Sequence, residues 1–190
     1  MMEYKELFPW VVGLHRLEEN DYDLIRDELV SNREDINKLF TNTTWQDNIQ
    51  TTFLKCRCLI TQFKLDKIEE IINPFIKSYL ERTGFGNKKY KLAQSWLNVS
   101  HPLGFQGLHI HGENYISGSV YLDCGEGTGD IQFSPPLNES SFKQSHSFTP
   151  ANGDIVVFHG QLPHRVLFNK SQNTRLSLTF NYYIDHDDMV

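Results

Sequence analysis

The sequence has few of the features that define several large protein classes. Its three cysteines, Cys56, Cys58 and Cys124, form no CxxC pair, so neither a disulfide framework nor a zinc-thiolate site is indicated. Acidic residues outnumber basic ones, 24 against 18, and the formal charge of −6 provides no overall attraction for nucleic acids or anionic membranes. The composition therefore does not indicate nucleic acid or a membrane as a partner.

Long apolar runs are also missing. No stretch reaches the roughly 20 apolar residues of a membrane-spanning helix. The N-terminal segment carries acidic residues early, unlike the basic and then apolar order of a signal peptide. We expect a soluble, cytoplasmic protein whose cysteines are free thiols, and the oligomeric state stays open.

The length of 190 residues fits one domain with a sizeable core. We predict a single domain over residues 1–190, with a helical N-terminal region (1–90) and a β core (91–183). Apolar residues recur at helical spacing from Asp21 to Phe40 and from Leu65 to Leu80, and Gly84 follows where the second helix should end. The pattern does not decide the structure of the segment from Thr41 to Lys64.

From Lys91 onward, short alternations of apolar and polar residues are separated by turn-forming clusters. This pattern predicts eight strands, which suit a jelly roll, the double-stranded β-helix of cupin-like proteins. The predicted fold is therefore mainly β with helical additions (α+β), with the N-terminal helices packed outside the roll. The predicted strands are Leu92–Val99, Gly107–His111, Ser117–Leu122, Gly129–Ser134, Ser145–Phe148, Asp154–Phe158, His164–Phe168 and Arg175–Tyr183.

Two histidines, His109 and His111, stand two residues apart in one predicted strand. In a strand this spacing places both imidazoles on one face, and His164 lies where a later strand would return beside the first. Neutral imidazoles on the inner wall of a small roll can bind a divalent metal. An HxH pair alone is also common on protein surfaces, so the pair needs further support.

That support comes from the last predicted strand, where Arg175, Ser177, Thr179 and Asn181 alternate with apolar residues. Such a polar face is either exposed to solvent or lines a wet pocket. If the face is inward, the guanidinium of Arg175 needs an anion, and a carboxylate matches its geometry. A carboxylate cosubstrate would fill this role.

Residues Gln94 to Asn181 resemble the 2-oxoglutarate and Fe(II)-dependent oxygenases, in particular a small family found in bacteria and phages. Each piece is short, but the order and spacing agree over somewhat under half of the chain. The pieces are Ser95-Trp96-Leu97-Asn98, His109-Ile110-His111-Gly112, Ser117-Gly118-Ser119-Val120-Tyr121-Leu122, Pro150 to Phe158 with Gly153-Asp154, Pro163-His164 and Arg175-Leu176-Ser177.

The resemblance implies that His109 and His164 are two of the iron ligands. The superfamily pattern has a carboxylate two residues after the first histidine, whereas this sequence has His111. We favour His111 as the third ligand because it shares the strand face of His109, with Glu113 and Asp123 as the alternatives. Three neutral ligands leave more charge on the metal than two imidazoles and a carboxylate do.

The resemblance also implies the residues that bind 2-oxoglutarate. Arg175 would pair with the carboxylate far from the metal, and Ser177 or Tyr121 would donate a hydroxyl group to it. Asn98 would stand near the metal or the cosubstrate. Tyr121 fits a role in the core equally well, because Ser117, Ser119 and Tyr121 share one strand face.

These implications describe a dioxygenase that uses Fe(II), 2-oxoglutarate and O2 to hydroxylate a substrate that the sequence does not name, releasing succinate and CO2. Two alternatives share the predicted fold. One is a cupin-like enzyme with three histidine ligands that does not use 2-oxoglutarate, and an outward-facing Arg175 would favour it. The other is a non-enzymatic ligand-binding jelly roll that purifies without stoichiometric metal.

Overall fold

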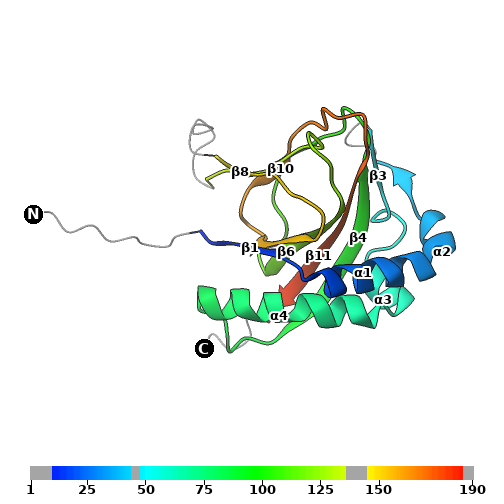
Figure 1. Cartoon of the computed structure of the whole chain (residues 1–190). Coiled ribbons are helices and arrows are strands. Elements are labelled where there is room, and N and C mark those ends of the chain that lie inside the picture. Colours follow the sequence, from blue (N-terminus) through cyan, green and yellow to red (C-terminus); the bar gives the residue numbers. More distant parts are fainter. Residues whose placement is uncertain (1–9, 44–47, 136–144, 186–190) are drawn as a thin grey trace, which may run out of the picture.

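The computed structural model describes residues 10–43, 48–135 and 145–185. Its strands form two antiparallel sheets that face each other across a cavity (Figure 1). The large sheet has the order β1 (Val12–Arg16), β9 (Asp154–His159), β6 (Tyr115–Asp123), β11 (Arg175–Ile184), β4 (Tyr90–Ser100), β3 (Ile49–Thr51) and β2 (Thr41–Asn42). The small sheet has the order β5 (Gln106–His109), β10 (His164–Val166), β7 (Ile131–Phe133) and β8 (His146–Phe148).

The helices lie along the outer face of the large sheet (Figure 1). They are α1 (Glu19–Ser31), α2 (Arg33–Asn37), α3 (Leu59–Phe63) and α4 (Asp66–Thr83). Isoleucines of α4, such as Ile72 and Ile76, are fully buried in one cluster with Leu178 and Phe180 of β11. Removing this apolar surface from water holds the helices on the sheet.

The helix predictions succeed except at one break. The apolar pattern from Asp21 to Phe40 predicts one helix, but the chain turns at Asn32 and forms two helices, α1 and α2. The side chain of Asn32 donates a hydrogen bond to the Glu28 carbonyl at this turn. The second helix ends as predicted, with Gly84 in the left-handed conformation that glycine adopts at little cost.

All eight predicted strands correspond to β4 through β11, with ends that shift by up to two residues. The expected mainly β fold with helices packed outside a double-stranded β-helix is confirmed. The pattern gives no indication of β1, β2 and β3, which precede residue 91 and occupy both edges of the large sheet. Their short length leaves too few residues for a period to be recognised.

The structure also bears on the cysteines and on the question of a membrane-spanning helix. Cys56, Cys58 and Cys124 are all free thiols, as predicted. In the part of the chain that the structure describes, no helix combines the length and apolar character needed to cross a membrane.

Candidate metal centre

The register of the large sheet explains why the polar residues of β11 gather in one cavity. Directly opposed residues on neighbouring strands point to the same face, so each pair extends across the sheet as a row. The rows pair Ser100 with Arg175, Asn98 with Ser177, Trp96 with Thr179 and Gln94 with Asn181. All eight residues line a cavity of about 430 Å³, so the polar face of β11 is inward and not exposed to solvent.

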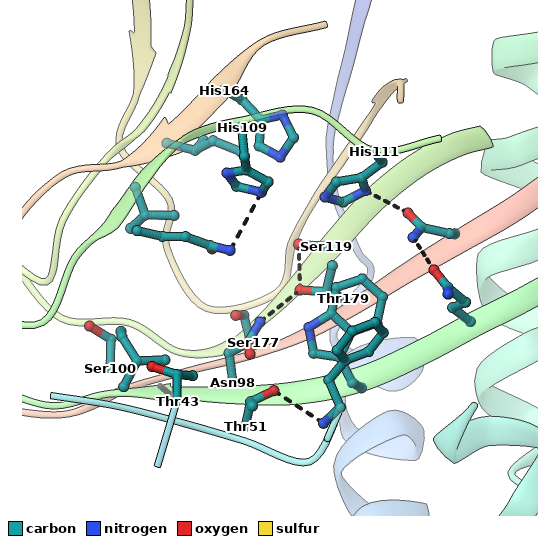
Figure 2. A pocket seen from close by; sticks show the side chains of 18 of the residues that line it. Thr43, Thr51, Asn98, Ser100, His109, His111, Ser119, His164, Ser177 and Thr179 are labelled. Atoms are coloured by element: carbon teal, nitrogen blue, oxygen red, sulfur yellow. Dashed lines mark hydrogen bonds between the residues drawn. The ribbon is translucent and has the colours of Figure 1, made fainter. Parts of the chain in front are cut away.

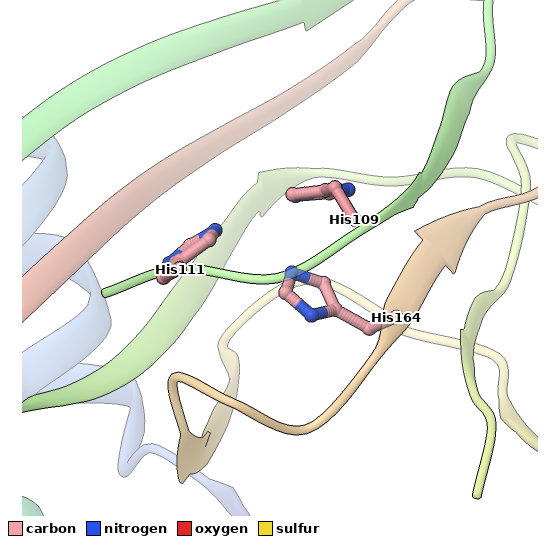
Figure 3. A group of neighbouring side chains, drawn as sticks. All are labelled: His109, His111 and His164. Atoms are coloured by element: carbon pink, nitrogen blue, oxygen red, sulfur yellow. The ribbon is translucent and has the colours of Figure 1, made fainter. Parts of the chain in front are cut away.

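Three histidines converge at the opposite wall of this cavity (Figures 2 and 3). His109 ends β5 and stands directly opposite His164 of β10 in the strand register. His111 lies just beyond β5, where its backbone N–H donates to the Gly160 carbonyl oxygen. One ring nitrogen from each histidine lies within 4.8 Å of the others, so the three imidazoles form a group that could hold one metal ion.

The strand predicted over Gly107–His111 therefore ends two residues early, at His109. The imidazoles of His109 and His111 still lie side by side, with ring centroids 5.3 Å apart. The expectation that both rings share one face holds, although the hydrogen bond to Gly160, rather than strand pairing, positions His111.

Each imidazole uses its Nδ1 atom for a hydrogen bond with an oxygen of the protein. The acceptors are the Gly107 carbonyl for His109, the Leu162 carbonyl for His164 and the Asn181 side-chain oxygen for His111, at 2.8–2.9 Å. A proton on Nδ1 satisfies each of these bonds and leaves the lone pair on Nε2 free for a metal. In the structure the Gln106 amide lies 3.4 Å from Nε2 of His109 and would have to give way.

The chain also fixes the orientation of Asn181. Its amide nitrogen donates to the Gln94 side-chain oxygen at 2.7 Å, so its own oxygen faces His111. Ser117 donates to the same oxygen at 2.8 Å. Partners of this kind hold a metal-binding imidazole in one tautomer and one orientation.

Burial keeps the three imidazoles in the neutral form that binds metals. It lowers the pKa of His109 below its usual value and lowers that of His111 to about 4. The pKa of His164 is lowered well below its usual value, first by burial and then by the two neighbouring imidazoles. Neutral, rigid rings with inward lone pairs fit a divalent transition metal such as Fe(II).

Arg175 is buried at the far end of the same cavity, with 6% of its surface exposed. Its guanidinium donates to the Gly129 carbonyl at 2.8 Å and lies 5.5 Å from the centre of the Tyr121 ring. No carboxylate forms an ion pair with Arg175 in the residues that the structure describes. A buried cation whose partners among the described residues are one carbonyl and one ring suits an anionic ligand.

The other predicted cosubstrate residues, Tyr121, Ser177 and Asn98, also line the cavity. Tyr121 is fully buried, and burial raises the pKa of its hydroxyl group, which therefore stays protonated and able to donate. Among the described residues, neither alternative ligand, Glu113 or Asp123, belongs to the histidine group, and both side chains are exposed.

Sequence reasoning missed one wall of the cavity. Thr43, Ile49, Thr51 and Phe53 come from the β2–β3 hairpin and the turn after it, and two of these residues are labelled in Figure 2. A strand of three residues carries no readable period, so only the tertiary structure brings this segment to the site.

Residues 94–181 match the family model described as "Putative 2OG-Fe(II) oxygenase". No curated protein matches the sequence. The match begins in β4 and ends in β11, so it includes the three histidines and Arg175.

Solved structures of similar fold cover nearly the whole chain. HygX from Streptomyces hygroscopicus, solved with nickel, 2-oxoglutarate and hygromycin B, has a TM-score of 0.64 at 13% identity and matches 92% of this chain and 83% of its own. A prolyl hydroxylase from Trichoplax adhaerens, in complex with a hypoxia inducible factor peptide, has a TM-score of 0.64 at 11% identity, covering 90% and 83%. A Pseudomonas putida prolyl-4-hydroxylase has a TM-score of 0.54 at 17% identity, covering 92% of each chain. The predicted resemblance to 2-oxoglutarate and Fe(II)-dependent oxygenases is thus confirmed, in sequence over residues 94–181 and in fold over about nine-tenths of the chain.

Proposed function

We propose that this protein is an Fe(II) and 2-oxoglutarate-dependent dioxygenase that hydroxylates an organic substrate. The observation that carries the proposal is one cavity with three neutral imidazoles at one wall and a buried arginine at another. The family match and the similar folds support the same conclusion.

In this proposal His109, His111 and His164 hold the metal through Nε2, and Asn181 and two backbone carbonyls orient the rings. When bound, the iron and 2-oxoglutarate supply oxidative decarboxylation with O2, which releases succinate and CO2. The chain supplies position and exclusion of water. Arg175 anchors the far carboxylate of the cosubstrate, and Ser177 or Tyr121 donates a hydroxyl group beside it.

The inward position of Arg175 favours this proposal over a three-histidine enzyme that does without 2-oxoglutarate. In that alternative nothing would require a cation buried at the far end of the cavity, where its desolvation costs free energy. We also propose a cytoplasmic location, because the three unpaired cysteines suit a reducing compartment.

The test is an anaerobic titration of the full chain with Fe(II) and then 2-oxoglutarate. We expect a weak visible charge-transfer band and, after oxygen is admitted, formation of succinate. His164→Ala should abolish both signals, whereas His146→Ala, which alters an exposed histidine of β8, should preserve them. No band and no succinate from the unaltered protein would refute the proposal.

A further inference from the structure

The cavity has two ends, and only one of them is used by the proposed function. Arg175 and Trp96 belong to rows four residues apart along β11 and β4, which corresponds to about 13 Å along the strands. The centroids of the Trp96 and His111 rings are 6.1 Å apart, so this second end is next to the histidines. Phe53 walls this end, whereas the β2–β3 hairpin borders the Arg175 end, where Ile49 of β3 pairs with Ser100.

An unbroken row of flat side chains runs from this end to the molecular surface. The Phe53 and Trp96 rings are 4.8 Å apart, and the guanidinium carbon of Arg57 lies 4.1 Å from the centre of the Phe53 ring. Arg57 is exposed and forms no ion pair among the residues that the structure describes. Because Phe53 covers one face of the guanidinium, its N–H edge stays available to an anion.

The charges around the cavity have one sign. Its described lining contains no Asp, Glu or Lys, and Arg175 is its one permanently charged side chain. With His111 where a carboxylate would be expected, no acidic group of the lining offsets a bound metal. A divalent metal and dianionic 2-oxoglutarate cancel, and Arg175 leaves the filled cavity with a net positive charge.

We propose that the Trp96 end is the substrate subsite and that it takes an organic anion with an apolar, ring-bearing body. The ring stacks on Trp96 and Phe53, the acidic group pairs with Arg57, and the reacting carbon faces His111. This inference rests on the proposed function for the charge of the filled cavity. A cationic substrate such as an amine finds no carboxylate in the lining that the structure describes.

Three probes that share one body separate charge from shape: 4-phenylbutyrate, its neutral amide, and 4-phenylbutylamine. Their affinities would be measured by ligand-observed NMR and calorimetry on the full chain loaded with Ni(II) and N-oxalylglycine. We expect the butyrate to bind about tenfold more tightly than the amide. A well-oriented ion pair between its carboxylate and the exposed Arg57 accounts for a difference of this size. The amine should bind most weakly of the three.

Variants assign the preference to particular residues. Arg57→Gln should remove the tenfold advantage of the anion and leave the affinity for the amide unchanged. Lys55→Gln alters a nearby exposed cation whose ammonium bonds to the Lys38 carbonyl, and should keep the advantage. Trp96→Leu should weaken butyrate and amide alike, because both stack on the ring.

The outcomes separate this inference from the proposed function. Failure of the protein to bind Ni(II) and N-oxalylglycine would overturn the proposed function and this inference together. Normal binding of both, with equal or absent binding of the three probes or with an advantage that survives Arg57→Gln, would overturn this inference alone.

Discussion

The two faces of strand β11 carry different kinds of buried side chain, one apolar and one polar. On the face toward the helices, Leu178, Phe180 and Tyr182 are buried in the apolar core. On the other face, Ser177 and Asn181 are equally buried but line the cavity. The apolar face stabilises the fold through buried area, whereas burial of the polar face costs free energy unless each group finds a partner.

Ser100 illustrates that cost. Its side chain lies opposite Arg175 on the cavity face, and among the described residues its hydroxyl group is buried without a hydrogen-bond partner, as is that of Tyr182 on the helix-covered face. An unsatisfied buried group costs about 1–3 kcal/mol. The comparison teaches that the helix-covered face is arranged for stability and the cavity face for binding, and substitutions on the two faces should separate these properties.

The largest effect on stability is expected from Phe180→Ala. The ring is fully buried, so its loss leaves a cavity and should lower the free energy of unfolding by about 3–5 kcal/mol. Thr179→Val, one residue away on the cavity face, should change it by no more than about 1 kcal/mol. Urea unfolding measures both values, and similar losses from the two variants would contradict the division between the faces.

Arg175→Leu should have the largest effect on binding. Loss of a buried partner of a carboxylate costs about 2–5 kcal/mol, which corresponds to a loss of cosubstrate affinity of about 30-fold or more. Metal affinity should change little. Calorimetry with N-oxalylglycine and Ni(II) measures both affinities. Arg165→Leu, which removes a guanidinium that bonds to Gln132 outside the cavity, is the control and should leave both intact.

Asn181→Ala should weaken the metal site about 10–100-fold, because His111 loses the acceptor that fixes its tautomer and orientation. Asn98→Ala changes an amide on the same cavity wall that contacts Thr179 instead of a histidine, and should preserve metal affinity. Competition of each variant with a chelator for Ni(II) measures the difference. Equal affinities would show that the contact does not support the metal.

The smallest effect should distinguish the two hydroxyl groups near Arg175. One of Ser177→Ala and Tyr121→Phe should reduce N-oxalylglycine affinity about tenfold, the value of one hydrogen bond to a carboxylate, and the other should leave it unchanged. Titration calorimetry on both variants identifies the donor. Unchanged affinity in both would leave Arg175 as the sole anchor and remove the hydroxyl group from the proposal.

Most of the correct structural predictions came from periodic patterns in the sequence. The eight strands after residue 91, the helix before Gly84 and the polar face of Arg175, Ser177 and Asn181 all follow from period and turn chemistry. Whether that polar face pointed inward stayed open, because an exposed strand has the same alternation. The register, which pairs β11 with β4 on one side and β6 on the other, and the helices on the opposite face settle the direction.

The sequence by itself determined which residue types could form the site, because side-chain chemistry and strand parity are local properties. Only the tertiary structure determined which of these residues lie close together. His164 joins His109 through pairing of β10 with β5, and Asn181 reaches His111 across 70 positions of sequence. Phe53 reaches the cavity wall, and Arg57 stacks on it, through a turn that has no period of its own, so no local pattern could have revealed the second end of the cavity.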